Sequence, residues 1–241
     1  MKLIRQRDSL GPELDYTAGE RMLRAVRASR EPVLRLYQPR PTVAFGRRDE
    51  LLAGFGAAER SARRSAFTPL VRKVGGRAAA YHRGCLIIDH IEPSEDPKAG
   101  IQDRFELFGD MIVAALEELE VHADVGELPG EYCPGEHSVH GTGRTVDRAQ
   151  AQIKLAGAAQ RVVSDAWYFS TVIVVEQSEP LRSVLTDVYR DLGLQWDPGT
   201  CGAVDDLRPG TRVSEVEAAV RKVYGMYARH MGYGSLKEQA F

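Results

Sequence analysis

Apolar residues recur at helical spacing in several long segments of the chain. In 101–119 they fall three and four residues apart, which is typical of a helix that buries one face. The same spacing predicts further helices on either side, and an Ala- and Arg-rich segment predicts another. The predicted helices are 14–29, 53–65, 101–119, 181–192 and 213–227.

Short apolar runs bounded by Gly and Pro predict β-strands between these helices. The runs 33–37 and 42–46 are separated only by a Pro-rich turn, so we expect a hairpin. The runs 78–82 and 85–91 meet at Arg83-Gly84 and predict a second pair of strands. This mixed order favours an α+β domain over a regular βαβ series. Other strands are expected at 70–74, 153–157 and 167–175, whereas 127–148 is rich in loop residues.

The composition fits one globular domain and argues against some classes of binding partner. The chain has 241 residues, 43% hydrophobic and 27% charged, so it can bury a core without disulfides or metals. We therefore expect a single domain over 1–241. A formal net charge of -2 gives no reason to expect nucleic acid or a membrane as partner. Because the first residues lack the apolar run of a signal peptide, the expected location is the cytoplasm, where the three cysteines would stay reduced.

One cysteine lies in a setting that suits a nucleophile. Cys133 stands in a Pro/Gly turn between Glu131 and Glu136 rather than in an apolar run. Those acids disfavour a thiolate, so activation requires a cation from elsewhere in the fold. A buried structural thiol is the commoner role of a lone cysteine, and the residues alone leave both roles open. Cys85 and Cys201 lie in a strand and a loop, and we interpret them as bystanders.

Lys154 or a histidine can supply that cation. Lys154 stands between Ile153 and Leu155 at the start of a stretch of small residues. A lysine in such a place either ends a strand in solvent or has an anionic or carbonyl partner, and the apolar neighbours favour the partner. His82 can be a general base, a hydrogen-bond donor or a structural histidine, of which the structural role is the commonest. The other histidines lack the spacing of a zinc site, so no metal is predicted.

A double glycine follows the predicted strand 70–74. Gly75-Gly76-Arg77 permits close approach of the backbone to a ligand, and the alanines at 78–80 leave space for a thin acyl chain. On these residues alone, an ordinary tight turn is favoured over a binding wall. The segment is not a Walker loop, because no Gly-Lys-Ser/Thr follows it.

These segments, in this order, resemble the biotin/lipoate protein ligase superfamily, in its lipoate-ligase and octanoyltransferase branch. The strand–turn–strand at 36–46, the Arg-rich strand with its Gly-Gly turn at 72–82 and the lysine signature at 154–161 are similar to motifs of that family. The resemblance covers roughly 14–192. It implies a mixed β-sheet flanked by helices, like the class II biotin/lipoyl synthetase catalytic domain, with an acyl tunnel beside the Gly-Gly turn. It also implies an octanoyl or lipoyl group and an acceptor lysine on a lipoyl carrier domain.

The cysteine loop resembles that of the cysteine-dependent octanoyl transferases and amidotransferases. This implies that Cys133 carries the acyl group as a thioester and that Lys154 hydrogen-bonds its carbonyl oxygen. It implies no cofactor, and a donor that is an acyl carrier protein or the glycine-cleavage H protein. The substrate-binding residues that it implies are Arg72, Gly75, Gly76, Arg77, Ala78, Tyr81, His82, Gly157 and Ala158.

Two other functions stay open. An ATP-dependent lipoate–protein ligase would use ATP and Mg²⁺ to form a lipoyl-adenylate, with Lys154 at the carboxylate and α-phosphate. Against it, the chain lacks the Asn-Asp pair that ligases usually carry near this point, and its loop has two glycines rather than three. Little chain follows residue 192 for an accessory domain. A non-catalytic acyl- or carrier-binding protein could share the fold, although Cys133 and Lys154 are both present.

Overall fold

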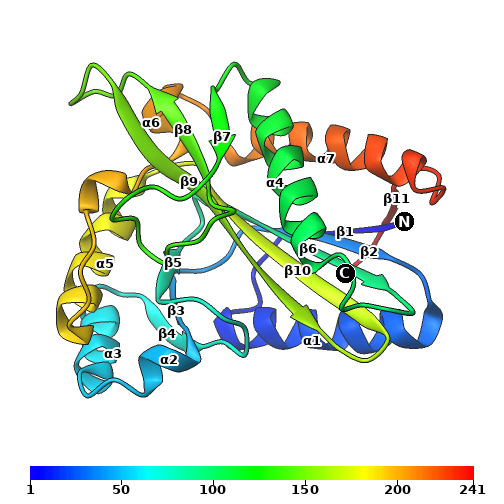
Figure 1. Ribbon diagram of the computed structural model, residues 1–241, viewed down its shortest axis with the longest axis horizontal. Helices are drawn as coiled ribbons and strands as arrows, with labels where there is room; N and C mark the ends of the chain where they lie inside the picture. The colour runs from blue at the N-terminus through cyan, green and yellow to red at the C-terminus, as the bar shows by residue number, and fades with distance from the viewer.

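The computed structural model describes residues 1–241 and contains two β-sheets with helices packed around them (Figure 1). The strands are β1 Lys2–Gln6, β2 Val33–Tyr37, β3 Thr42–Phe45, β4 Thr68–Val71, β5 Ala79–Tyr81, β6 Cys85–Pro93, β7 Ala123–Val125, β8 Val139–Gly143, β9 Ala151–Val162, β10 Ala166–Val174 and β11 Lys237–Gln239. The helices are α1 Pro12–Ser29, α2 Arg47–Glu50, α3 Phe55–Arg64, α4 Ile101–Glu117, α5 Ser178–Leu192, α6 Val204–Leu207 and α7 Val213–His230, with a 3₁₀ turn at Pro198–Thr200.

The larger sheet has eight strands in the order β11-β1-β2-β6-β10-β9-β8-β7, and the smaller has three in the order β4-β3-β5. In the larger sheet β11, β1 and β2 run parallel, and the neighbours from β2 to β7 are antiparallel. The smaller sheet is also mixed, since β3 is parallel to β4 and antiparallel to β5. The predicted α+β class, with a mixed sheet flanked by helices, is confirmed.

Helices cover both faces of the larger sheet. The helices α4 and α7 pack on each other and on one face, whereas α1 lies on the other face against β6 and β10 (Figure 1). Leu34, Ile88, Phe108 and Tyr224 belong to the core under α4 and α7. A second core joins α3 and α5 to the smaller sheet. None of the helices has the length and apolar character needed to cross a membrane.

The five predicted helices are present, but neither predicted hairpin forms. The strand β2 lies between β1 and β6 in the larger sheet, whereas β3 lies in the smaller one. All five residues of β2 are buried, so it is a central strand covered on both faces. Pro39 and Pro41 in the link lack the N–H groups that a tight hairpin turn uses. The link therefore carries the chain from one sheet to the other.

The second predicted hairpin is also absent, because its two strands belong to different sheets. The strand β5 pairs with β3, whereas β6 pairs with β2 and β10. Arg83-Gly84 is thus a junction between sheets rather than a hairpin turn. The loop-rich segment 127–148 contains a further strand, β8, which pairs with β9. Its two glycines and its polar residues conceal this strand in the sequence. The sequence does not predict β1, β7 and β11 because none of them contains a run of three apolar residues.

Candidate active site

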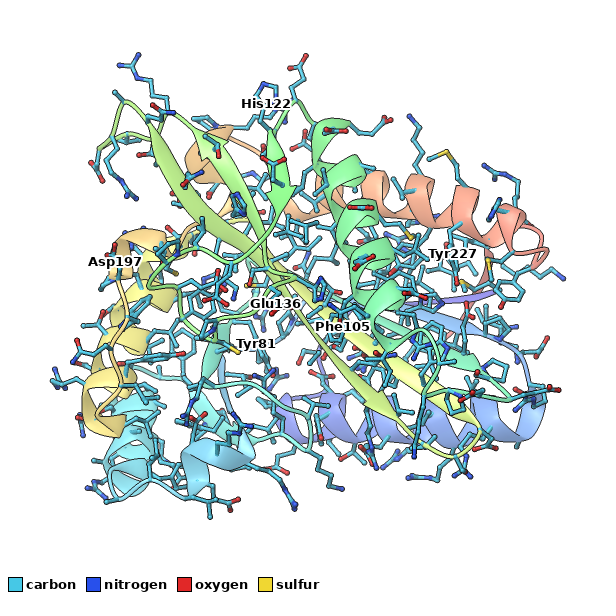
Figure 2. The ribbon with its side chains drawn as sticks, viewed as in Figure 1. Tyr81, Phe105, His122, Glu136, Asp197 and Tyr227 are labelled. Carbon is cyan, nitrogen blue, oxygen red and sulfur yellow. The ribbon has the colours of Figure 1, made fainter.

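A cavity of about 410 Å³ lies where the two sheets meet. Its wall is formed by β9 and β10 of the larger sheet, β3 and β5 of the smaller one, α1, the loop 72–76 and the cysteine loop 132–138. Figure 2 shows three of the lining residues, Tyr81, Phe105 and Glu136, near the centre of the molecule. A cavity of this size is ordinary for a small-molecule site.

The cavity brings together both candidate catalytic residues and most of the implied substrate-binding residues. Cys133, in the loop between β7 and β8, and Lys154, in the adjacent strand β9, meet at one wall of the cavity. The implied substrate-binding residues that line the cavity are Arg72, Gly75, Gly76, Tyr81, Gly157 and Ala158.

Three implied substrate-binding residues do not line the cavity. Arg77 directs its guanidinium to the buried carboxylate of Asp49, at 3.2 Å. Ala78 is fully buried in the core under α5. His82 is buried outside the cavity, and its Nδ1 and Nε2 lie 2.8 and 2.9 Å from backbone groups of Gly84 and Gln177. Satisfied on both ring nitrogens, His82 has the environment of a structural histidine.

The sulfur of Cys133 faces two N–H donors. The backbone N–H of Arg77 donates to Sγ at 3.2 Å, and Nη2 of Arg72 donates to it at 3.4 Å. The N–H of Cys133 donates to the hydroxyl of Tyr189 at 2.6 Å, and that hydroxyl donates to the carbonyl of Ala78 at 3.0 Å. Burial raises the pKa of Tyr189, so its hydroxyl stays protonated and able to bridge the two backbones. The φ of Cys133 is 44°, a left-handed conformation that is uncommon without glycine.

Lys154 attaches the cysteine loop to β9. Its Nζ donates to Oε1 of Glu131 at 3.1 Å, to the carbonyl of Tyr132 at 3.0 Å and to the carbonyl of Cys133 at 2.9 Å. Three acceptors match the three protons of an ammonium group. The side chains of Lys154 and Glu131 are only 3% and 0% exposed, so the pair is shielded from water. The expected acceptor of Lys154, the carbonyl oxygen of a substrate, would have to displace one of these partners.

The Gly-Gly turn passes directly beside the sulfur. Gly76 has a φ of +97°, and a Cβ built on it would lie 2.6 Å from Nη2 of Arg72 and 2.8 Å from Sγ of Cys133. Such distances are well inside van der Waals contact, so only glycine leaves the sulfur and the guanidinium in place. Arg77, the residue after Gly76, is held in place because its guanidinium donates to the carboxylate of Asp49 in α2.

The other two thiols differ from Cys133 in their surroundings. Cys85 and Cys201 are fully buried, and burial raises the pKa of each to about 12. They therefore remain protonated and unreactive at neutral pH. Cys133 is half-buried and lies on the cavity wall.

Three residues that shape the site were not selected from the sequence. The sequence shows Glu131 only as an acidic neighbour of the cysteine, although its position two residues away is a usable signal. Tyr189 lies on the apolar face of α5, where a tyrosine is indistinguishable from a core residue. Asp49 lies in a polar stretch that shows no periodicity. For these last two, only the tertiary structure reveals the contact.

The sequence matches one family model and several named relatives. The model of the lipoyl protein ligase A/B catalytic domain matches residues 14–206. The octanoyl-[GcvH]:protein N-octanoyltransferase of Geobacillus kaustophilus is 27% identical over 184 residues, which are 76% of this chain and 62% of that protein. The protein of the same name from Anoxybacillus flavithermus is 30% identical over 182 residues, 73% of this chain and 62% of that protein. The aligned part therefore spans less than two thirds of each relative.

Solved structures share the fold. Lipoate-protein ligase A bound with ATP superposes with a TM-score of 0.72 at 17% identity, covering 100% of this chain and 88% of that one. The bi-partite lipoate protein ligase from Thermoplasma acidophilum gives 0.72 at 17% identity, covering 100% and 86%. At such identities the likeness concerns the fold, and it agrees with the architecture that the resemblance implied.

Proposed function

The chain belongs to the lipoyl protein ligase A/B catalytic domain family, and on this premise we propose that it is an acyltransferase that moves an octanoyl or lipoyl group through a thioester on Cys133 to a lysine of a lipoyl carrier domain. The observation that carries the proposal is a thiol on the wall of a cavity, with two N–H donors on its sulfur. The names of the relatives support an octanoyl group and, as its donor, the glycine-cleavage H protein.

The proposed reaction has two acyl transfers. In the first, Sγ of Cys133 attacks the carbonyl carbon of the donor's acyl-lysine amide, the C–N bond breaks, and the thiol proton ends on the released amine. In the second, the acceptor lysine amine attacks the thioester, the C–S bond breaks, and one amine proton returns to sulfur. No oxidant, reductant or nucleotide is consumed. With acyl carrier protein as the donor, the first step exchanges one thioester for another.

The cavity beside the sulfur fits an acyl chain. Its apolar lining includes Ala79, Ile87, Phe105, Ala158 and Val172. Burial of apolar surface contributes roughly 0.8 kcal/mol for each methylene, which is about a fourfold change in affinity for each carbon of the chain. The wall therefore favours a medium-length acyl group over an acetyl group.

The test is incubation with octanoyl-H protein or octanoyl-acyl carrier protein, without ATP, followed by intact-mass measurement. The parent protein should gain one octanoyl group, and Cys133→Ser should gain none. Cys201→Ala serves as the control for removal of a thiol, because Cys201 is buried and does not line the cavity, and it should be acylated like the parent. Full transfer activity in Cys133→Ser would refute the proposal.

An ATP-dependent ligase is the alternative, but the cavity wall offers little to a magnesium nucleotide. Of its three carboxylates, Asp15 already pairs with Arg35 and Glu20 with Arg161, which leaves Glu136 as the one without an ion-pair partner. No three His, Cys, Asp or Glu side chains are grouped to hold a metal ion. Lipoate-dependent release of pyrophosphate in Cys133→Ser would favour the ligase, and octanoate binding without turnover would favour a non-catalytic binding protein.

A further inference from the structure

The polar groups nearest to Cys133 are mostly committed to other partners. All three protons of Lys154 have acceptors in the segment 131–133. The N–H of Cys133 is taken by Tyr189, and the N–H of Gly135 by Glu131. None of these groups contacts the sulfur. The cation expected to act on the acyl carbonyl is therefore already used in holding the loop.

Arg72 is the cationic side chain that reaches the sulfur. Its Nη2 lies 3.4 Å from Sγ of Cys133 and 2.8 Å from the carbonyl of Arg77, so one nitrogen joins the sulfur to the Gly-Gly turn. Unlike Arg77, which is paired with Asp49, Arg72 has no carboxylate partner. Its Nε is buried and makes no hydrogen bond. A guanidinium without a counter-ion, aimed at a thiol, is suited to balance a negative charge that forms there.

We propose that Arg72 is a further catalytic cation of this site, which stabilises the Cys133 thiolate and then the oxyanion formed when that sulfur attacks. The proposal rests on the proposed function for the identity of the acyl substrate. Attack places the carbonyl carbon one bond from Sγ, so the oxyanion develops within reach of the guanidinium that contacts the sulfur.

The test measures the sulfur directly, by the rate of alkylation with iodoacetamide at pH 7.0 and pH 9.5. Alkylation forms the S–C bond and releases iodide, and it requires the thiolate. Cys85 and Cys201 stay silent because burial raises the pKa of both to about 12. The variants are Arg72→Gln and Arg72→Lys, with Lys73→Gln as the control. Lys73 is the adjacent cation, but its ammonium is exposed and lies 3.9 Å from Glu20.

Arg72→Gln should be alkylated about threefold more slowly at pH 7.0. A charge-assisted hydrogen bond changes the thiolate population by about tenfold, and the higher intrinsic reactivity of a less stabilised thiolate recovers about threefold of this. The Arg72→Gln rate should rise relative to the parent rate from pH 7.0 to pH 9.5 and should no longer lie below it, because hydroxide then removes the thiol proton without help from the guanidinium. Arg72→Lys should fall between the two at pH 7.0, and Lys73→Gln should match the parent at both pH values.

Two results would overturn the proposal. One is an unchanged rate in Arg72→Gln at pH 7.0. The other is an equal slowing at both pH values, which would mean that Arg72 only shapes access to the thiol. If Arg72→Gln does not fold, Arg72→Lys decides by the same comparison. Failure here is distinct from failure of the proposed function, because the octanoyl adduct is measured on proteins that keep Arg72.

Discussion

Gly76→Ala should disturb both the stability of the fold and the sulfur of the site. The new Cβ would lie 2.6 Å from Nη2 of Arg72 and 2.8 Å from Sγ of Cys133, so both groups must move. The backbone is also unfavourable, because a φ of +97° costs a residue with a Cβ about 1–2 kcal/mol. Displacing Arg72 breaks its bond to the carbonyl of Arg77, which adds about 1 kcal/mol.

The sum is about 2–3 kcal/mol of lost unfolding free energy. With a urea m-value of roughly 3 kcal/mol/M for a chain of this size, the unfolding midpoint should fall by about 0.7–1 M. Urea denaturation followed by tryptophan fluorescence measures this shift. The alkylation rate of Cys133 in native protein, measured in parallel, should also change.

The neighbouring glycine provides the matched comparison. A Cβ on Gly75 would meet no atom within 4 Å, and Gly75 is not among the glycines with positive φ. Gly75→Ala should therefore unfold within about 0.5 kcal/mol of the parent protein. Equal midpoints for Gly76→Ala and Gly75→Ala would refute the claim that the turn must pass beside the sulfur without a side chain.

Two further predictions concern buried charges. Lys154→Met leaves the carboxylate of Glu131 buried without its cation and should lower the unfolding free energy by about 3 kcal/mol in urea titrations. Adding Glu131→Gln should recover part of this loss. If it recovers nothing, the pairing of the two side chains is contradicted. Burial opposes the charge of Glu92, but hydrogen bonds with His90 and two tyrosine hydroxyls outweigh it and lower the pKa of Glu92 below its ordinary 4.5. Because its pKa is lower in the folded chain, Glu92 stabilises the fold above about pH 4.5, and this contribution disappears as the pH falls. The destabilisation caused by Glu92→Gln should thus be smaller at pH 3.5 than at pH 7, and an equal difference at both pH values would count against this account.

The long helices could be predicted from the sequence because each carries its own apolar periodicity. The pairing of the short strands could not, because it depends on which sheet receives each strand. The strands β2 and β3 are neighbours along the chain, yet one is a buried central strand and the other belongs to a separate sheet. The Pro-rich link between them is compatible with a turn or a crossing, and only the packing of both ends decides.

In the candidate site, too, the sequence could not predict contacts that depend on how distant segments pack. The apolar neighbours of Lys154 correctly predicted that the lysine has carbonyl or anionic partners. They could not indicate that those partners lie in the cysteine loop, because this depends on the docking of the loop against β9. The role of Tyr189 was similarly hidden, since the position of its hydroxyl follows from the packing of α5 against the small sheet.

The pinned backbone of Cys133 has a kinetic consequence. Its carbonyl is bound by Lys154 and its N–H by Tyr189, and its φ lies in the left-handed region, so the rotation left to the sulfur is about the Cα–Cβ bond. The thiol therefore stays at one position, and on the proposed function the donor and acceptor carriers must bind at the same site in turn. Such an enzyme follows ping-pong kinetics, in which each carrier in excess competes with the other for a single entrance.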